Sequence, residues 1–207
     1  MRNKTEIIWR HDLAYAVGLL ATDGNLSSDG RHMVLVSKDI EQINTFKRCL
    51  GINNRISLKA SGYTKTKKYY FVQFGNVNLY RWLQQIGLTP KKSKTISKLS
   101  IPDEYLSDYL RGYIDGDGSL SVFQDAVYPN SQRLYTRFFS GSLKHLKWLK
   151  SRIKSLFRVD GFIGKVSGAY ELRYAKTASI TLLNAIYYNK NIPCLQRKRK
   201  LIEQFLN

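Results

Sequence analysis

Hydrophobic positions along the first part of the chain switch between helical and strand periods in a regular order. Apolar residues at helical spacing cover residues 13–22, two short strand-like runs follow, and Asp39 caps a helix that runs to about residue 50. Two more strand-like runs precede a helix over 77–86. Recurrence every three or four residues predicts helices, and strict alternation predicts strands. This part therefore reads α-β-β-α-β-β-α.

The same order occurs a second time. A helix over about 107–117 is followed by strands near 119–123 and 134–140, then by a helix that Ser142 caps and that runs to about residue 157. Two further strand-like runs and a helix over 177–188 complete the copy. The sequence therefore predicts an internal repeat of one α+β unit.

The first helix of each copy contains a glycine and ends in Asp-Gly. Gly112 follows Gly18 and Asp117 follows Asp23 by the same 94 positions (112 − 18 and 117 − 23). A solvated Asp-Gly turn is the alternative interpretation for either motif alone. Its repetition at one geometric point favours a two-fold site with two carboxylates.

Small residues mark one side of each of these helices: Ala14, Gly18, Ala21 and Thr22 in the first, and Gly112 and Gly116 in the second. Glycine inside a helix costs about 1 kcal/mol relative to alanine, so it usually has a packing reason. Close parallel packing of the two helices would bring their acidic ends together.

Both acids lie where helices disfavour negative charge. A helix C-terminus carries partial negative charge, so an aspartate there is unfavourable unless a cation neutralises it. Each aspartate also precedes a glycine, which predicts a left-handed C-cap at Gly24 and Gly118. Local rules of this kind are most often broken at functional sites.

These motif segments resemble the LAGLIDADG family of homing endonucleases. Residues 110–118 are a close match, and 18–24 match less well because Ala21 stands where the family often has its first aspartate. The resemblance covers nearly the whole chain. It implies an α+β fold of two pseudo-symmetric α-β-β-α-β-β-α repeats, with paired central motif helices and a saddle of antiparallel sheets. The expected organisation is a first repeat over 1–94, a linker over 95–102 and a second repeat over 103–207.

Composition favours a nucleic-acid partner. Lys and Arg number 34 against 15 Asp and Glu, which gives a net charge of +19, and the pI is about 10.0. The charge is spread along the chain rather than gathered in one amphipathic segment, which argues against a membrane-surface role. No apolar run is long enough to span a bilayer, and the polar start, residues 1–12, predicts no signal peptide. Cys49 and Cys194 are isolated, so we expect reduced thiols in a cytoplasmic setting, bacterial or in an organellar matrix.

Alternating polar residues on the predicted strands form the candidate DNA-reading face. Arg133, Tyr135 and Arg137 alternate with apolar residues, and Lys59 and Lys165 hold places 106 residues apart in the two predicted hairpins. β-ribbons fit the major groove of DNA, where Arg, Lys and Gln read base edges. The expected DNA-binding residues are Lys38, Gln42, Lys59, Gln73, Lys91, Arg133, Tyr135, Arg137, Lys165, Arg173 and Arg197.

The candidate chemistry is metal-dependent phosphodiester hydrolysis. Mg²⁺ takes one or two carboxylates plus substrate phosphates and waters, which suits Asp23 and Asp117. The resemblance adds the backbone carbonyls of Thr22 and Gly116 as metal ligands. We expect Mn²⁺ to substitute, and Ca²⁺ to support binding without cleavage.

The resemblance also assigns basic residues to the site. Lys92 and Lys198 hold matched positions and look like the family's catalytic lysines, while Lys91 and Arg197 are one-residue alternatives.

Two further positions differ between the copies. Lys38 and Gln42 stand where the family often carries a water-organising residue, but Gly141 and His145 hold the matched places in the second copy. The mismatch predicts an asymmetric site.

The most specific functional expectation is a monomeric homing endonuclease. It would cut both strands of a long, non-palindromic double-stranded DNA site and leave short 3′ overhangs. The alternatives are an intron RNA splicing maturase, with host intron RNA as its partner, and a non-catalytic DNA-binding regulator of the same fold. Both motif acids are present, which favours the nuclease.

Overall fold

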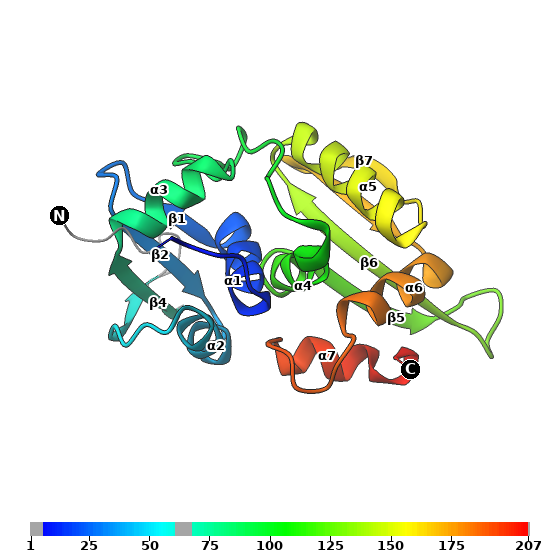
Figure 1. Cartoon of the computed structure of the whole chain (residues 1–207). Helices are drawn as coiled ribbons and strands as arrows, with labels where there is room; N and C mark the ends of the chain where they lie inside the picture. The colour runs from blue at the N-terminus through cyan, green and yellow to red at the C-terminus, as the bar shows by residue number, and fades with distance from the viewer. Residues whose placement is uncertain (1–5, 61–67, 207) are drawn as a thin grey trace.

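The protein consists of two similar halves joined through a pair of central helices (Figure 1). The computed structural model describes residues 6–60 and 68–206. Each half contains one four-stranded antiparallel sheet, with strand order β1-β2-β4-β3 in the first and β5-β6-β8-β7 in the second. The expected α+β fold with a repeated order of elements is confirmed.

The elements follow the predicted order closely. The first half contains α1 (His11–Thr22), β1 (Gly24–Leu26), β2 (His32–Ser37), α2 (Ile40–Leu50), β3 (Ile56–Ala60), β4 (Lys68–Gly75) and α3 (Val77–Gln85). The second contains α4 (Leu106–Asp115), β5 (Ser119–Gln124), β6 (Gln132–Ser140), α5 (Leu143–Phe157), β7 (Phe162–Val166), β8 (Ala169–Tyr174), α6 (Lys176–Ile186) and α7 (Gln196–Ile202). Short 3₁₀ turns precede α4 and follow α7.

The halves differ after their third helix. The second half continues into α7, whereas residues 90–95 of the first half form turns. Pro90 lies at the start of this segment and Lys91 adopts a left-handed φ of 56°, which interrupts any helix there. The first hairpin, expected at 59–62, lies partly outside the described residues. The second turns at Gly168, which has a φ of 73°.

The two motif helices α1 and α4 pack directly against each other at the centre of the molecule. All residues of α1 from Leu13 to Ala21 are buried, because α4 lies on one side and the first half's own elements cover the rest. A Cβ on Gly18 would lie 2.3 Å from the carbonyl oxygen of Tyr109 and 2.7 Å from the amide nitrogen of Tyr113. The predicted reason for the internal glycines, close approach of two helix backbones, is therefore confirmed.

The predicted left-handed caps are wrong. Neither Gly24 nor Gly118 is among the glycines with positive φ. Instead, a Cβ on Gly24 would lie 2.6 Å from the Cα of Leu20, and one on Gly118 would lie 2.5 Å from the Cα of Ile114. Each glycine is needed because the chain turns back tightly against its own motif helix to begin the first strand.

Each sheet has one covered face and one open face. Helices α2 and α3 pack on the first sheet, and α5 and α6 pack on the second. In β6 the buried residues Leu134, Thr136 and Phe138 alternate with partly exposed Arg133, Tyr135 and Arg137. This alternation confirms the predicted polar face. Within residues 6–60 and 68–206, no helix is long and apolar enough to cross a membrane.

Candidate active site

The two motif acids lie together where the motif helices end. Asp23 is the C-terminal cap of α1, and Asp117 follows the end of α4 by two residues. A Cβ on Gly116 would lie 3.3 Å from Oδ2 of Asp23, so the end of α4 is in contact with the first acid. Both acids line a cavity of about 330 Å³ that also takes in Gly116 and Asp115. The structure therefore brings the two predicted metal ligands to one place.

The electrostatics of the acids favour binding of a cation. Burial, and then the nearby charge of Asp117, raise the pKa of Asp23 to about 7. Desolvation also raises the pKa of Asp117, although the residue is exposed, while Lys92 and Lys198 oppose the shift. The repulsion between the two carboxylates opposes their ionisation at the same time. A divalent cation between them would stabilise the doubly charged pair.

Lys92 and Lys198 are buried, and their ammonium groups contact the ends of the motif helices. Lys92 Nζ donates to the carbonyls of Thr22, at 3.3 Å, and Gly24. Lys198 Nζ donates to the matched carbonyls of Gly116, at 3.4 Å, and Gly118, at 2.8 Å. The contacts repeat at the 94-residue offset.

Each lysine supplies positive charge that its helix lacks. Neither α1 nor α4 has a basic residue in its last turn, so the lysines neutralise the helix dipole from outside. Burial lowers the pKa of both lysines, and the nearby acids counteract this shift. The carbonyls of Thr22 and Gly116 are thus lysine acceptors as well as candidate metal ligands.

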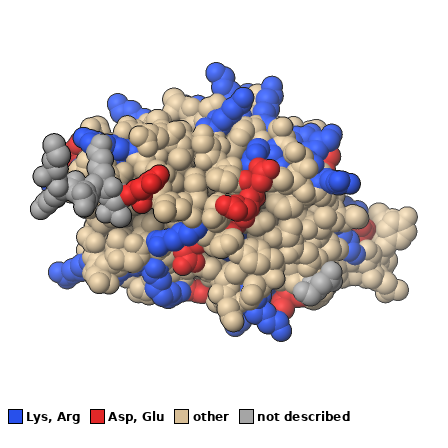
Figure 2. All heavy atoms as spheres, in the orientation of Figure 1, with Lys and Arg blue, Asp and Glu red and all other residues tan. Residues whose placement is uncertain are grey.

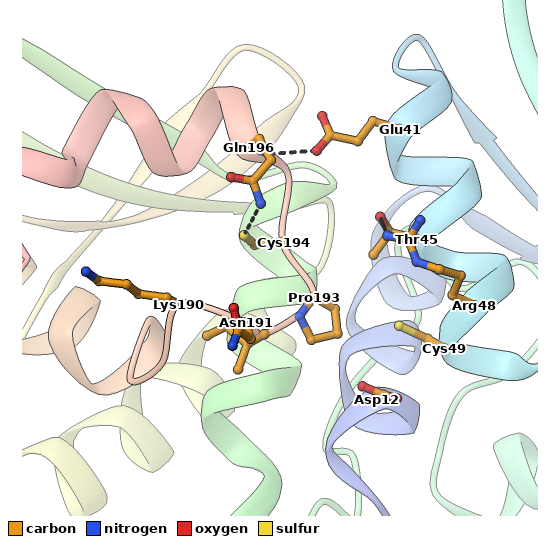
Figure 3. A pocket seen from close by; sticks show the side chains of 11 residues that line it. Asp12, Glu41, Thr45, Arg48, Cys49, Lys190, Asn191, Pro193, Cys194 and Gln196 are labelled. Atoms are coloured by element: carbon orange, nitrogen blue, oxygen red, sulfur yellow. Dashed lines mark hydrogen bonds between the residues drawn. The ribbon is translucent and has the colours of Figure 1, made fainter.

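The one-residue alternatives, Lys91 and Arg197, have different surroundings from the two buried lysines. Lys91 is exposed, and Arg197 forms an ion pair with Asp39, with Nη2 and Oδ2 2.9 Å apart. The backbone N–H of the preceding residue, Gln196, donates to Glu41 at 3.2 Å (Figure 3). Arg197 therefore joins the start of α7 to the start of α2 at the rim of the acidic cavity. Its partner Asp39 was not identified as a site residue from sequence, because the ion pair joins residues 158 positions apart.

A second cavity, of about 540 Å³, lies between α2 and residues 190–196 (Figure 3). Cys49 and Cys194 contribute to its lining, and both are free and buried. Burial raises the pKa of the Cys49 thiol to about 12. Burial also raises the pKa of the Cys194 thiol, so both cysteines fit the expected structural role.

Asp115 is a buried acid at the end of α4 for which the sequence predicted no role. It accepts hydrogen bonds from the Tyr15 hydroxyl at 2.8 Å and from the backbone N–H of Leu195 at 2.7 Å. Burial raises its pKa to about 6. Because Leu195 is the N-cap of α7, Asp115 fixes the start of the helix that carries Lys198. In the sequence, only its position directly before Gly116 of the motif could have indicated a role.

The basic sheet-face residues of the second half form a cluster. The guanidinium groups of Arg137 and Arg173 lie 5.0 and 5.8 Å from the ring centroid of Tyr135, and both ion-pair with Glu171 at 3.7 and 3.6 Å. Arg133, another expected DNA-binding residue, forms an ion pair in which its Nε lies 2.6 Å from Oδ2 of Asp125. On the first sheet, Lys59 pairs with Tyr69 and Gln73 with Val34, which places both on the open face.

The predicted place of Lys165 on this open face is wrong. Lys165 pairs with Tyr170, which shares its face with buried Leu172, whereas Arg173 lies on the opposite face. Strands β3 and β7 occupy equivalent places in the two sheets. Ile56 of β3 pairs with Val72, and Ile163 of β7 pairs with Leu172, so the structural offset between these strands is 107 (163 − 56). The sequence offset of 106 is one residue short, and a one-residue slip reverses the face of every side chain.

Basic side chains are distributed over both halves rather than gathered in one block (Figure 2). Among the residues that the structure describes, no cluster of three or more His, Cys, Asp and Glu could hold a metal. The cavity between the helix ends instead offers two carboxylates and backbone carbonyls, a set of hard oxygen donors that fits Mg²⁺.

Comparison with known proteins identifies the fold. No family model matches the sequence, and no curated protein is significantly similar to it. Among solved structures, the homing endonuclease I-WcaI bound to its DNA recognition sequence is 9% identical, with a TM-score of 0.67 over 97% of this chain and 89% of that one. I-DmoI in complex with DNA and Ca is 14% identical, with a TM-score of 0.62 over 93% and 97%.

The chain is also similar in structure to DUF199/WhiA. Full-length DUF199/WhiA from Thermatoga maritima is 13% identical, with a TM-score of 0.58 over 97% of this chain, which spans 63% of its length. The N-terminal LAGLIDADG domain of WhiA matches over 98% of this chain and 91% of its own, with the same TM-score. The chain therefore has the LAGLIDADG homing endonuclease fold, with both motif helices in a single polypeptide.

Proposed function

We propose that the protein is a site-specific, metal-dependent DNA endonuclease that cuts both strands of a long, non-palindromic site. The observation that carries this proposal is the pairing of Asp23 and Asp117 at the parallel ends of α1 and α4, with a buried lysine beside each. Because both halves of the site belong to one chain, the proposed working unit is a monomer.

Asp23 and Asp117 would hold Mg²⁺, with the carbonyls of Thr22 and Gly116 as further candidate ligands. A divalent metal at this place would supply an activated water and neutralise charge on the leaving oxygen. The protein's own groups hold the geometry: α1 and α4 fix the separation of the acids, and Lys92 and Lys198, held at the helix ends, would provide positive charge beside the scissile phosphates. Their hydrogen bonds to the helix ends prevent them from moving away when DNA is absent.

The open sheet faces would bind the DNA. Arg137, Arg173 and Tyr135 lie on one face of the second sheet, and Lys59 and Gln73 lie on that of the first. Two twisted antiparallel sheets on either side of the acids would follow the major groove on both sides of the cleavage point. The net charge of +19 supplies attraction to the phosphates.

A non-catalytic DNA-binding protein is the second candidate, because WhiA shares the fold. The two acids distinguish the candidates, since DNA binding alone gives no reason to keep two carboxylates beside phosphates. An RNA partner is the remaining alternative, and neither the site geometry nor the sheet faces favour it over duplex DNA.

The test is selection from a randomised duplex library. The protein is incubated with the library in Mg²⁺, Mn²⁺ or Ca²⁺, and both bound duplexes and cleaved ends are sequenced. The proposal predicts one long site, cut in both strands with short 3′ overhangs in Mg²⁺ and Mn²⁺, and bound uncut in Ca²⁺. Selective binding without cleavage in any metal would instead support the non-catalytic candidate, and absence of selective binding would overturn both.

A further inference from the structure

Two phenylalanines are exposed on the open face of the second sheet. Phe123 of β5 is 45% exposed and Phe162 of β7 is 61% exposed. Phe123 pairs with Arg133, and Phe162 pairs with Arg173. Directly paired residues share a face, so both rings lie on the side that the helices leave open. Because β5 and β7 are the two edge strands of this sheet, the rings lie on either side of its central basic residues.

The two rings belong to one connected group that crosses all four strands. Phe123 stacks on Tyr135 of β6, with ring centroids 5.8 Å apart and an interplanar angle of 22°. The guanidinium of Arg173 in β8 lies 5.8 Å from the ring centroid of Tyr135 and 5.7 Å from that of Phe162. We call these four residues the aromatic layer. Its internal contacts hold the rings in place before a partner binds, so binding would order few side chains.

The aromatic layer is suited to an interaction rather than to folding. Neither Phe123 nor Phe162 belongs to the hydrophobic core of the described residues. Large apolar side chains that lie together in water mark an interaction site. The layer lies on the face that we propose binds DNA, so the partner to consider is the duplex.

The equivalent places in the first half hold polar residues. Arg55 takes the place of Phe162, because β3 and β7 are offset by 107 residues (162 − 55). Gln73 takes the place of Arg173, because β4 and β8 are offset by 100 residues (172 − 72). Both Arg55 and Gln73 are exposed. The first half therefore offers hydrogen-bond donors where the second offers an apolar ring.

Thymine is the base that an apolar ring recognises in the major groove. Its C5 methyl is the apolar group on the base edges there, and phenylalanine is among the residues that contact it. The rings of Phe123 and Tyr135 already stack on each other, and Arg173 lies over Phe162. Stacking of an unpaired base would need a free ring face, whereas contact with a methyl group needs only exposed ring carbons. The layer therefore favours the edges of paired bases.

We propose that Phe123 and Phe162 read thymine methyl groups, so that the half of the target bound by the second repeat is defined by thymines as well as by hydrogen bonds. Each ring covers the methyl of one thymine, and Arg173 between them is free to read a neighbouring base. The inference rests on the DNA binding that is part of the proposed function.

The experiment removes the methyl groups one at a time. Each thymine of the selected duplex is replaced in turn by deoxyuridine, which lacks only the C5 methyl, and binding is measured in Ca²⁺. At least one position for each ring, all in the same half of the site, should bind about fourfold more weakly, as expected for loss of one buried methyl group. Where cytosine replaces such a thymine, 5-methylcytosine should bind more tightly than cytosine, because it restores only the methyl.

Variants assign each methyl group to its ring. Phe123→Ala and Phe162→Ala should each bind the thymine and deoxyuridine forms of one position equally and keep the loss at the others. Val77→Ala is the matched control, because it shortens an exposed apolar side chain at the start of α3, on the covered side of the first sheet. It should keep every loss. Thermal unfolding should change little in the phenylalanine variants, since both rings lie outside the core.

The outcomes separate this inference from the proposed function. The inference would be overturned if deoxyuridine weakened binding equally in the wild-type protein and in both phenylalanine variants, or weakened it nowhere. Tighter binding of a single strand than of the duplex would also overturn it, because the rings would then stack on unpaired bases. Methyl-dependent binding without cleavage in Mg²⁺ would overturn the endonuclease function alone, and absence of selective duplex binding would overturn both.

Discussion

Gly18 and Gly112 face each other where α1 and α4 pack together. A Cβ on Gly112 would lie 3.2 Å from the Cα of Gly18 and 2.1 Å from the carbonyl oxygen of Tyr15. The two helix backbones are therefore in direct contact, and this contact fixes how far apart the acids at the helix ends can be.

Replacing either glycine by alanine should force the helices apart. Gly18→Ala and Gly112→Ala are each expected to lower the free energy of unfolding by about 3 kcal/mol, the upper range for overpacking. Gly51→Ala is the control, because a Cβ there meets no atom within 4 Å and only the strain of its φ of 64° remains, about 1 kcal/mol. Urea unfolding measures all three. Equal losses at Gly51 and Gly112 would show that the helices are not in tight contact.

The buried lysines should contribute to stability as well as to cleavage. Lys198→Met removes charge-assisted hydrogen bonds to the end of α4. It is expected to lower the free energy of unfolding by about 2 kcal/mol and to abolish cleavage. Lys91→Met is the matched control at an exposed site and should change stability by less than about 0.5 kcal/mol. Thermal and urea unfolding test this. A Lys198→Met protein as stable as the control would mean that the lysine serves the substrate alone.

Much of the fold was predictable because it follows from local patterns that occur twice. Helical spacing in α1 and α4, alternation in β6 and the Asp-Gly ends were all visible in the sequence, and their 94-residue offset predicted that the acids meet. The resemblance then supplied the arrangement of the two halves.

The missed features depend on three-dimensional contacts or on register. The ion pair of Arg197 with Asp39 joins distant elements, so no local pattern indicates it. The face of Lys165 was mispredicted because one residue of register decides it. Gly24 was assigned a left-handed conformation because a glycine after a helix usually has one, whereas here close packing on Leu20 requires it.

His145 should make the protein sensitive to acid. Burial lowers its pKa from 6.5 to about 4, so the unfolded chain binds the proton more tightly than the folded one. Its stabilising effect is complete above pH 6.5 and is lost as the pH falls toward 4, by about 2 kcal/mol between pH 6.5 and 5. Urea unfolding across this range should show a shallower pH dependence for His145→Asn than for the wild-type protein. The same slope in both would mean that the imidazole is not held neutral.

Salt should weaken DNA binding steeply. If six or more phosphates are contacted, a plot of log K against log salt should have a slope of about −5 or steeper. A fluorescence titration of the selected duplex at several salt concentrations measures this slope, and a slope near zero would exclude a binding surface made by the basic residues.

The sheet arginines should act on sequence preference. Arg173→Ala is expected to relax the preference at one or two base positions, by about 1–3 kcal/mol at each, because its guanidinium lies on the open face beside Tyr135. Lys92→Met should instead weaken cleavage of every sequence. A cleavage profile over all single-base variants of the target separates these effects. A uniform loss for Arg173→Ala would show that this residue does not read bases.

Cleavage by variants of the two motif acids tests the central claim most directly. Asp23→Asn and Asp117→Asn are each assayed on the selected duplex in Mg²⁺, with binding measured in Ca²⁺ and thermal unfolding in the absence of DNA. The account predicts that neither variant cuts both strands, that both still bind the duplex, and that their thermal stability rises slightly, because a carboxylate is removed from a helix C-terminus beside another acid. Full double-strand cleavage by either variant would contradict it.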